Sequence, residues 1–197
     1  MSDTKEKILL SALRLFAERG YEAVSVSDIA GELSITKGAL YKHYKNKQSI
    51  FDSIVLRMEE LDFERAVLFD VPEGTKDEMN EKYETTPLSN LLSFSRAQFD
   101  YWTKDEFASA FRKMLTLEQF KNEEMKNLYG RYLVSGPLGY VEDIFSSVGE
   151  KDPKNLAAEL YGAMFFFICL YDVSDAKETV RSDFETYLCS FEKSLGL

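Results

Sequence analysis

The chain has 197 residues, with 34 acidic and 24 basic side chains and a formal net charge of −10. That balance excludes a protein that coats nucleic acid over its whole surface, but it leaves room for a local basic patch. The hydrophobic fraction of 45% is typical of a folded globular chain. Glycine and proline are scarce, at 10 and 4 residues, which favours helices over a turn-rich sheet. We therefore expect an all-α fold.

The number of cysteines and the length of the apolar runs bear on possible disulfide and metal sites and on the cellular location. Cys169 and Cys189 lie in apolar helical stretches, which predicts buried free thiols. Two cysteines and one histidine are too few for a disulfide framework or a zinc site, and we expect no metal and no cofactor. The N-terminus lacks the apolar run of a secretory signal, and the longest uncharged apolar run, residues 161–171, is shorter than the about 20 residues that span a bilayer. We expect a cytoplasmic protein without a membrane partner.

The first fifty residues predict one helix followed by two short ones. Apolar residues recur at helical spacing over residues 4–19, and Gly20 stands where a C-terminal cap belongs. Ser25 and Asp28 form a capping-box-like start for the second helix, and Thr36 is the expected N-cap of the third. Two short helices joined by a tight turn are the layout of a helix-turn-helix.

The rest of the chain is predicted to be helical, except for a polar, acidic loop over residues 70–87 that contains two prolines. A fourth helix is expected from Lys47 to residue 69. Further helices are expected over residues 88–103, 105–120, 122–135, 137–148, 153–172 and 176–195. We place the domain boundary at the start of the fourth helix, which gives domains of residues 1–47 and 48–197.

Charge is unevenly distributed along the chain. Residues 1–50 hold eight basic and six acidic side chains and therefore carry +2, whereas the remainder holds 16 basic and 28 acidic side chains and carries −12. Residues 36–47 contain four lysines and no acid. A basic N-terminal segment on an acidic body indicates local binding to a polyanion.

The third helix has residue types that suit the DNA major groove, which admits one α-helix. Thr36 and the nearby N–H groups can bind a phosphate, and Lys37 can donate to guanine O6 or N7. Gly38 and Ala39 have almost no side chain, so the helix can approach the base edges closely. Phosphate contacts without sequence preference are expected from Tyr41, Lys42, Lys45 and Lys47.

The residues Ser-Val-Ser-Asp-Ile-Ala at 25–30 and Thr-Lys-Gly-Ala-Leu-Tyr-Lys-His-Tyr-Lys-Asn-Lys at 36–47 resemble the TetR family of bacterial transcriptional regulators. The match covers about residues 8–51, and the rest of the chain resembles the family only in length and helical character. Ser34 stands where the family usually has glycine, which predicts a small strain in the turn, and Tyr44 replaces the usual phenylalanine.

The resemblance implies an N-terminal three-helix DNA-binding head, with Ile29 and Leu40 in its core. Lys37 and Ala39 would face bases, and His43 would either contact a phosphate or make a structural hydrogen bond. The positions implied at the DNA are Ser27, Thr36, Lys37, Gly38, Ala39, Tyr41, Lys42, His43 and Lys47. Among these, the side chain of Ser27 is short for such a contact.

The resemblance also implies an effector pocket in the larger helical body, although aromatic side chains at helical spacing are more often core. The pocket candidates are Trp102, Phe111, Met114 and Tyr129. Asp100 or Glu118 would either select a cationic ligand or simply face solvent.

The helix over residues 153–172 is apolar almost all round, which predicts burial on both faces. By resemblance, the last two helices pair with those of a second copy, and the alternative is a simple monomer core. The candidate dimer contacts are Leu160, Met164, Phe167, Phe184, Leu188 and Phe191. A dimer would present two heads to two half-sites.

Together these features predict a homodimeric regulator, a repressor that binds a palindromic operator and is released by a small molecule. The alternative is a helical interaction or small-molecule-binding module that has lost its affinity for DNA. An enzyme is disfavoured, because the sequence contains no readable nucleophile–base set, metal cluster or phosphate loop.

Overall fold

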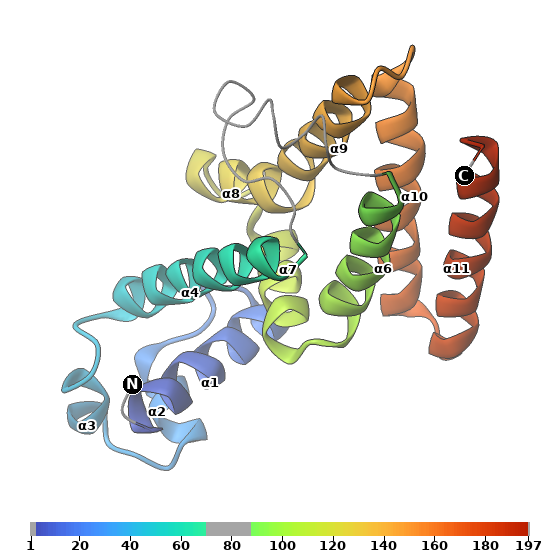
Figure 1. The fold of residues 1–197 in the computed structure, drawn as a ribbon. Helices are drawn as coiled ribbons and strands as arrows, with labels where there is room; N and C mark the ends of the chain where they lie inside the picture. The colour runs from blue at the N-terminus through green and yellow to red at the C-terminus, as the bar shows by residue number, and fades with distance from the viewer. Residues whose placement is uncertain (1–2, 70–87, 197) are drawn as a thin grey trace. The chain divides into compact units, whose positions relative to one another are not determined.

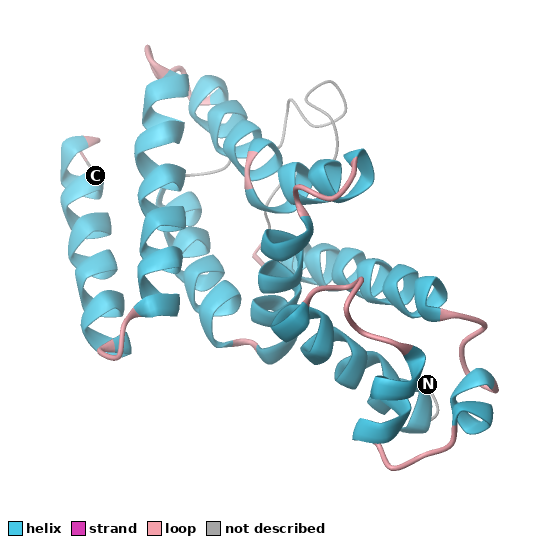
Figure 2. Ribbon diagram, turned by 180° about the vertical axis from the view of Figure 1, so that it is seen from behind, coloured by secondary structure: helices cyan, strands magenta, loops and turns pink. Residues whose placement is uncertain are grey.

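The protein is described by a computed structural model over residues 3–69 and 88–196. All regular structure in this part of the chain is helical (Figures 1 and 2), which confirms the predicted all-α fold. The loop predicted over residues 70–87 lies outside the described residues.

The chain divides into two compact units. The first, which we call the head unit, combines Met1–Asp62 with Glu106–Tyr129. The second, the body unit, combines Phe63–Asp105 with Gly130–Leu197. The domain boundary expected at residue 47 follows the sequence motif alone, whereas the compact head unit also takes the start of the fourth helix and a separate segment from the middle of the chain.

The head unit is built on α1 (Asp3–Arg19), α2 (Val26–Glu32), α3 (Lys37–Tyr41), the first part of α4 (Lys47–Leu68), α7 (Glu106–Glu118) and most of α8 (Glu123–Leu133). Helix α1 packs along α7 (Figure 1), and the apolar stripe read from the sequence supplies its buried face. Ile8 and Phe16 on α1 and Phe111 and Leu115 on α7 are fully buried. This core explains why residues 106–129 belong with the N-terminal helices.

The caps predicted for the short helices are confirmed. The Ser25 hydroxyl accepts a hydrogen bond from the Asp28 N–H at 3.2 Å, and the Asp28 carboxylate accepts one from the Ser25 N–H at 2.7 Å. The Thr36 hydroxyl accepts the Ala39 N–H at 3.1 Å. Gly20 ends α1 with φ +84°, a conformation that favours glycine.

The body unit contains α6 (Leu88–Lys104), α9 (Ser135–Ser147), α10 (Pro153–Val173) and α11 (Lys177–Ser194). Helix α10 packs against the other three. Its start is as expected, with Pro153 in the first turn and Asp152 as N-cap. At the centre, the rings of Phe99 and Phe184 stack with centroids 4.5 Å apart, and the Tyr161 hydroxyl donates to the Leu133 carbonyl at 2.7 Å.

Two burial predictions for α10 and α11 are wrong for the single chain. Helix α10 is not buried on both faces, because Phe166 is 60% exposed and Val173 is 81% exposed. Cys169 and Cys189 are exposed rather than buried. By length and composition α10 could also cross a membrane, a test that core helices of soluble proteins pass as well.

Candidate DNA-binding interface

Helices α2 and α3 form a helix-turn-helix whose turn is closed by backbone hydrogen bonds. The Ser34 N–H donates to the Gly31 carbonyl at 3.0 Å, and the Ile35 N–H donates to the Ala30 carbonyl at 2.9 Å. Ser34 has φ +54°, the left-handed conformation in which a residue with a side chain is strained. The strain predicted from the missing glycine is therefore present.

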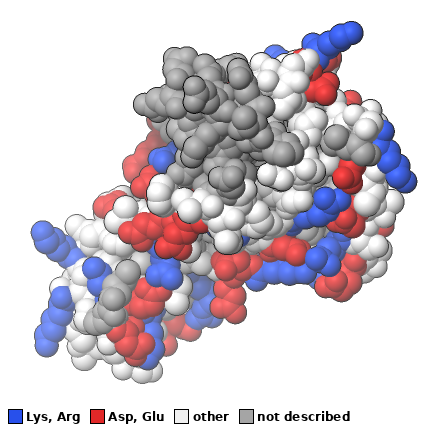
Figure 3. Space-filling model, viewed as in Figure 1, with Lys and Arg blue, Asp and Glu red and all other residues white. Residues whose placement is uncertain are grey.

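The inward and outward faces of this motif are clearly separated. Ile29 and Leu40 are fully buried, as expected. Most of the positions predicted at DNA are exposed residues on α2, α3 and their flanks, namely Ser27, Thr36, Lys37, Gly38, Tyr41 and Lys42. Ala39 and His43 are partly exposed. Basic side chains project from the part of the head unit that holds α3 (Figure 3), so this face offers donors to a polyanion.

Tyr44 keeps the core role of the residue that it replaces. Its side chain is buried, and its hydroxyl donates to the Lys5 carbonyl at 3.4 Å. Burial raises the pKa of the phenol. The added hydroxyl therefore has a partner on α1 and does not disturb the motif.

Lys47 has a different environment from the other lysines of the motif. Its Nζ donates to the Tyr21 carbonyl at 2.7 Å and lies 4.1 Å from the centroid of the Tyr21 ring. The Glu22 carboxylate is 4.0 Å away, and only 22% of the Lys47 side chain is exposed. The ammonium is thus already bound within the head unit, and a phosphate contact through its remaining N–H donors stays a prediction.

Glu118, which we expected either to select a ligand or to face solvent, does not face solvent in the head unit. Its side chain is 2% exposed, and its carboxylate accepts the Tyr21 N–H at 2.9 Å. The two residues are 97 positions apart, so no local pattern in the sequence signals this contact.

Comparison with known proteins bears on this interface directly. The model of the family described as bacterial regulatory proteins, tetR family, matches residues 8–54. The HTH-type transcriptional regulator YerO of Bacillus subtilis is 42% identical over 50 residues, which are 25% of this chain and 17% of that protein. Residues 8–54 therefore match the N-terminal domain of the TetR family. The match therefore confirms the resemblance drawn from residues 25–47.

Two further comparisons concern a relative of the N-terminal segment and a solved structure with the same fold. The biofilm operon negative transcriptional regulator IcaR of Staphylococcus aureus is 41% identical over 51 residues, 26% of this chain and 27% of that protein. The solved SmeT–triclosan complex matches with a TM-score of 0.67 at 19% identity, over 97% of this chain and 90% of that chain. The chain thus shares the SmeT fold nearly throughout, whereas its sequence matches only about a quarter of the length of IcaR.

The pocket residues implied by the TetR resemblance are distributed over both units. Phe111 and Met114 are fully buried in the head unit, where Tyr129 is partly exposed, and Trp102 is buried in the body unit. Which of them meet a ligand stays a prediction. Among residues 3–69 and 88–196, no group of three or more His, Cys, Asp or Glu side chains is placed to hold a metal.

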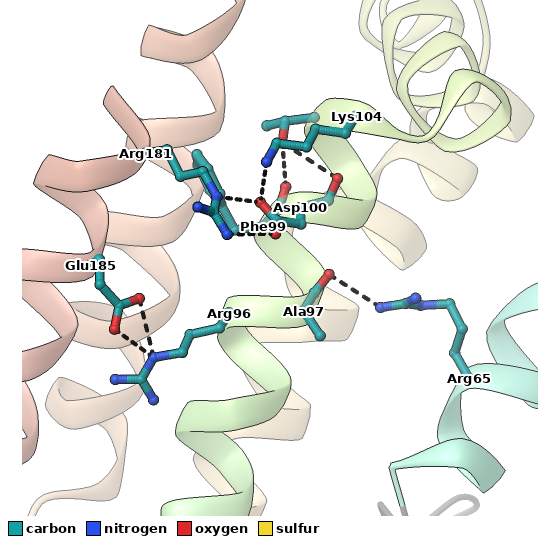
Figure 4. Close-up of polar contacts among 9 residues, drawn as sticks. Arg65, Arg96, Ala97, Phe99, Asp100, Lys104, Arg181 and Glu185 are labelled. Carbon is teal, nitrogen blue, oxygen red and sulfur yellow. Dashed lines mark hydrogen bonds and ion pairs between the residues drawn. The ribbon is translucent and has the colours of Figure 1, made fainter. Parts of the chain in front are cut away.

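Asp100, the other acid considered for ligand selection, is paired instead. In the body unit it binds Arg181 from α11 and Lys104 from its own helix (Figure 4). One turn away, the Nε–H of Arg96 donates to both carboxylate oxygens of Glu185, at 2.8 and 3.1 Å. These ion pairs border a surface hollow of about 540 Å³ along α6 and α11. The Asp100 carboxylate therefore holds two helices together.

The dimer residues expected for a TetR protein lie mainly in the core of the chain itself. Leu160, Met164, Phe184, Leu188 and Phe191 are buried within the single chain, and Phe167 is partly exposed. The five buried side chains pack within their own chain, and the dimer contact of Phe167 stays a prediction. Periodicity shows which residues share a face but not whether that face meets the same chain or a second copy. The outward face of α10 carries Ala158, Gly162, Phe166, Cys169 and Val173.

Proposed function

We propose that this chain is a DNA-binding transcriptional regulator, a repressor that binds a palindromic operator as a homodimer and releases it when a small molecule binds. The observation that carries the proposal is the exposed face of α3, which stands on a helix-turn-helix whose inward residues, Ile29 and Leu40, are fully buried. The family consists of transcription factors rather than enzymes, which supports the same reading.

Contacts to bases come from the start of α3. Lys37 is exposed at its first position and can donate to guanine O6 or N7 in the major groove. The site where a side chain on Gly38 would begin has one atom within 4 Å, the Thr36 hydroxyl at 3.8 Å, so it is open to the groove. Ala39 adds one methyl group beside them.

Contacts to the phosphate backbone come from the end of α3 and from its cap. Tyr41 is 50% exposed and presents its hydroxyl, and Lys42 follows it with an exposed ammonium. Thr36 accepts the Ala39 N–H through its oxygen, so its own O–H proton remains available for a phosphate. Ser27 and His43 stand at the edges of this surface as weaker candidates.

Dimer formation is supported by the outward face of α10. Ala158, Gly162, Phe166, Cys169 and Val173 follow one another at intervals of three or four residues, so they form one exposed stripe that is apolar or small throughout. A contiguous apolar surface of this kind marks an interaction site, and small residues let two helices approach closely. A second copy of the chain is the occupant that the two-half-site mechanism requires.

Repression and release by a ligand are supported by the relatives. IcaR is described as a negative regulator, and SmeT, which shares the fold, was solved with triclosan. Trp102, Phe111, Met114 and Tyr129 remain the proposed pocket residues. A ligand that binds better to a state with displaced heads would lower the affinity for DNA by its differential affinity for the two states.

The test is selection from a random duplex library, followed by titration of the selected duplex at several salt concentrations. An enriched inverted repeat with an affinity of about 10⁻⁸ M or better that falls steeply with salt is the expected result. If no sequence is enriched and no salt-dependent binding occurs, the chain is instead a helical binding module without affinity for DNA.

A further inference from the structure

Both peptide groups of Tyr21 are bound by side chains from other helices of the head unit. Its N–H donates to Glu118, the last residue of α7, at 2.9 Å. Its carbonyl accepts from Lys47, the first residue of α4, at 2.7 Å. A turn residue that is held from two helices has a fixed position, and that position depends on both of them.

The Tyr21 side chain strengthens this anchorage. Its ring makes edge contacts with Phe16 at 5.1 Å and Phe51 at 5.3 Å, and its hydroxyl donates to Gln48 at 2.9 Å. Burial raises the pKa of the phenol. The Lys47 ammonium lies over the same ring, an arrangement in which cation and ring attract each other.

The location of this contact along the chain gives it a consequence. Tyr21 precedes α2 and Lys47 follows α3, so their hydrogen bond joins the two ends of the segment that contains the whole helix-turn-helix. Closing a segment at its base removes conformational freedom from everything between the closure points. The hydrogen bond from the Tyr21 N–H to Glu118 links this closed end of the segment to α7.

The surroundings of Gly20 show how closely the Glu118 carboxylate approaches the backbone beside Tyr21. A Cβ atom on Gly20 would lie 2.8 Å from the Glu118 Oε1 atom, shorter than a van der Waals contact. The Glu118 carboxylate therefore lies against the backbone at Gly20, and a side chain there would require the carboxylate to move. Such an approach at 2% exposure is a specific fit and not a surface contact.

We infer that Glu118, Tyr21 and Lys47 form a clasp that positions the helix-turn-helix and makes its order depend on α7. Glu118 and Lys47 are positioning residues, because they act on α2 and α3 through Tyr21. When the end of α7 moves, the clasp loses its buried acceptor and the ends of the DNA-binding segment become free to separate. The inference rests on the proposed function for its purpose, but the clasp itself can be measured without DNA.

The experiment compares Glu118→Gln with Glu118→Met in the full chain by amide hydrogen exchange. Both variants are neutral and of similar size, but only glutamine keeps an oxygen that can accept the Tyr21 N–H. A hydrogen bond to a charged acceptor makes a large contribution to stability. Its loss in Glu118→Met should therefore speed hydrogen exchange about tenfold at Tyr21 and across residues 26–41. Glu118→Gln should stay within about threefold of the wild type, because a neutral bond keeps part of that contribution. Glu123→Met, a change at an exposed acid in the same unit, should have no effect.

The same variants are then titrated with the duplex selected by the wild-type chain. Glu118→Met should bind it about tenfold more weakly with an unchanged salt slope, because no phosphate contact is lost. The inference is overturned if hydrogen exchange over residues 26–41 is equally fast in Glu118→Met and in the wild type. If Glu118→Met fails to fold, the wild type alone decides, and a Tyr21 amide that is not protected from exchange overturns the inference. If the wild type selects no duplex, the proposed function fails, and exchange in the free chain still decides whether the clasp exists.

Discussion

Arg181 on α11 holds Asp100 on α6 with two parallel hydrogen bonds, from Nε to Oδ1 at 2.9 Å and from Nη2 to Oδ2 at 3.0 Å. Lys104 adds a third contact to the same carboxylate at 3.2 Å. The hydrogen bond from Arg181 is the main reason that the pKa of Asp100 lies below its ordinary value of 3.8. The two helices are therefore joined by an interaction that depends on an ionised carboxylate.

This pair predicts a pH dependence of stability. Because the pKa is lowered in the folded state, the contribution is complete above pH 3.8 and is lost as the pH falls through the lowered value. Asp100→Asn should reduce the free energy of unfolding at pH 7 by less than about 1 kcal/mol, since the pair is partly exposed. Urea unfolding measured between pH 7 and pH 2 checks this, because the difference in the free energy of unfolding between Asp100→Asn and the wild type should become smaller at low pH. Asp183→Asn, at an exposed position on α11, is the control, and an equal effect there would contradict the assignment.

Gly20→Ala should be destabilising for two independent reasons. The residue has φ +84°, which costs an L-residue about 1–2 kcal/mol, and the new methyl group would meet the Glu118 carboxylate. Gly31→Ala is the matched control, because Gly31 is helical and has no atom within 4 Å of the site where Cβ would be placed. Alanine should stabilise that exposed helical position by up to about 1 kcal/mol. Equal stabilities for the two variants in urea unfolding would refute the close approach.

Lys47 and Lys42 should differ in how their loss affects salt dependence. Lys42→Met removes an exposed ammonium. The negative slope of log affinity against log salt should become less steep by about 0.9 for one lost phosphate contact. Lys47→Met should weaken binding without changing the slope, because its ammonium is bound to Tyr21. A drop of the same size for Lys47→Met would mean that Lys47 contacts a phosphate, as the sequence motif predicts.

Lys37→Ala tests base recognition. Loss of a base contact should cost about 1–3 kcal/mol in binding and relax the preference at one position in each half-site. Selection from a random library with the variant measures both effects. An unchanged base preference would assign Lys37 to the backbone instead.

Phe166→Glu tests the outward face of α10. Phe166 is 60% exposed in the single chain, and a carboxylate at a helix–helix contact would be buried without a partner, so the variant should be monomeric. Phe120, which is 88% exposed outside α10, provides the control Phe120→Glu. Light scattering at micromolar concentration should give twice the chain mass for the wild type and the control. A monomeric wild type would remove the two-half-site mechanism.

The sequence predicted local features well because their causes are local. The cap at Thr36 follows from neighbours within a few residues. The strain at Ser34 and the buried positions of Ile29 and Leu40 were implied by the resemblance of the short motif at residues 25–47 to the TetR family. The role of Glu118 could not be predicted, because its partner is 97 positions away and a carboxylate at the end of a helix is usually exposed.

The orientation of the last two helices was harder for a different reason. Periodicity placed Leu160, Met164 and Phe184 on apolar faces but did not say which surface covers them. Helix α10 has apolar residues on several sides, so a choice between its inner and outer faces requires the packing of α9, α6 and α11 around it.

The head unit is assembled from two separated stretches of chain, and this limits how its binding specificity can be transplanted. A chimera that takes only Met1–Asp62 into a related regulator would leave behind the α7 surface on which α1 packs, together with the carboxylate of Glu118. The transferable cassette is therefore Met1–Asp62 plus Glu106–Tyr129. A chimera joined at a single point would work only if the host regulator already had the same α7 surface for α1 to pack against.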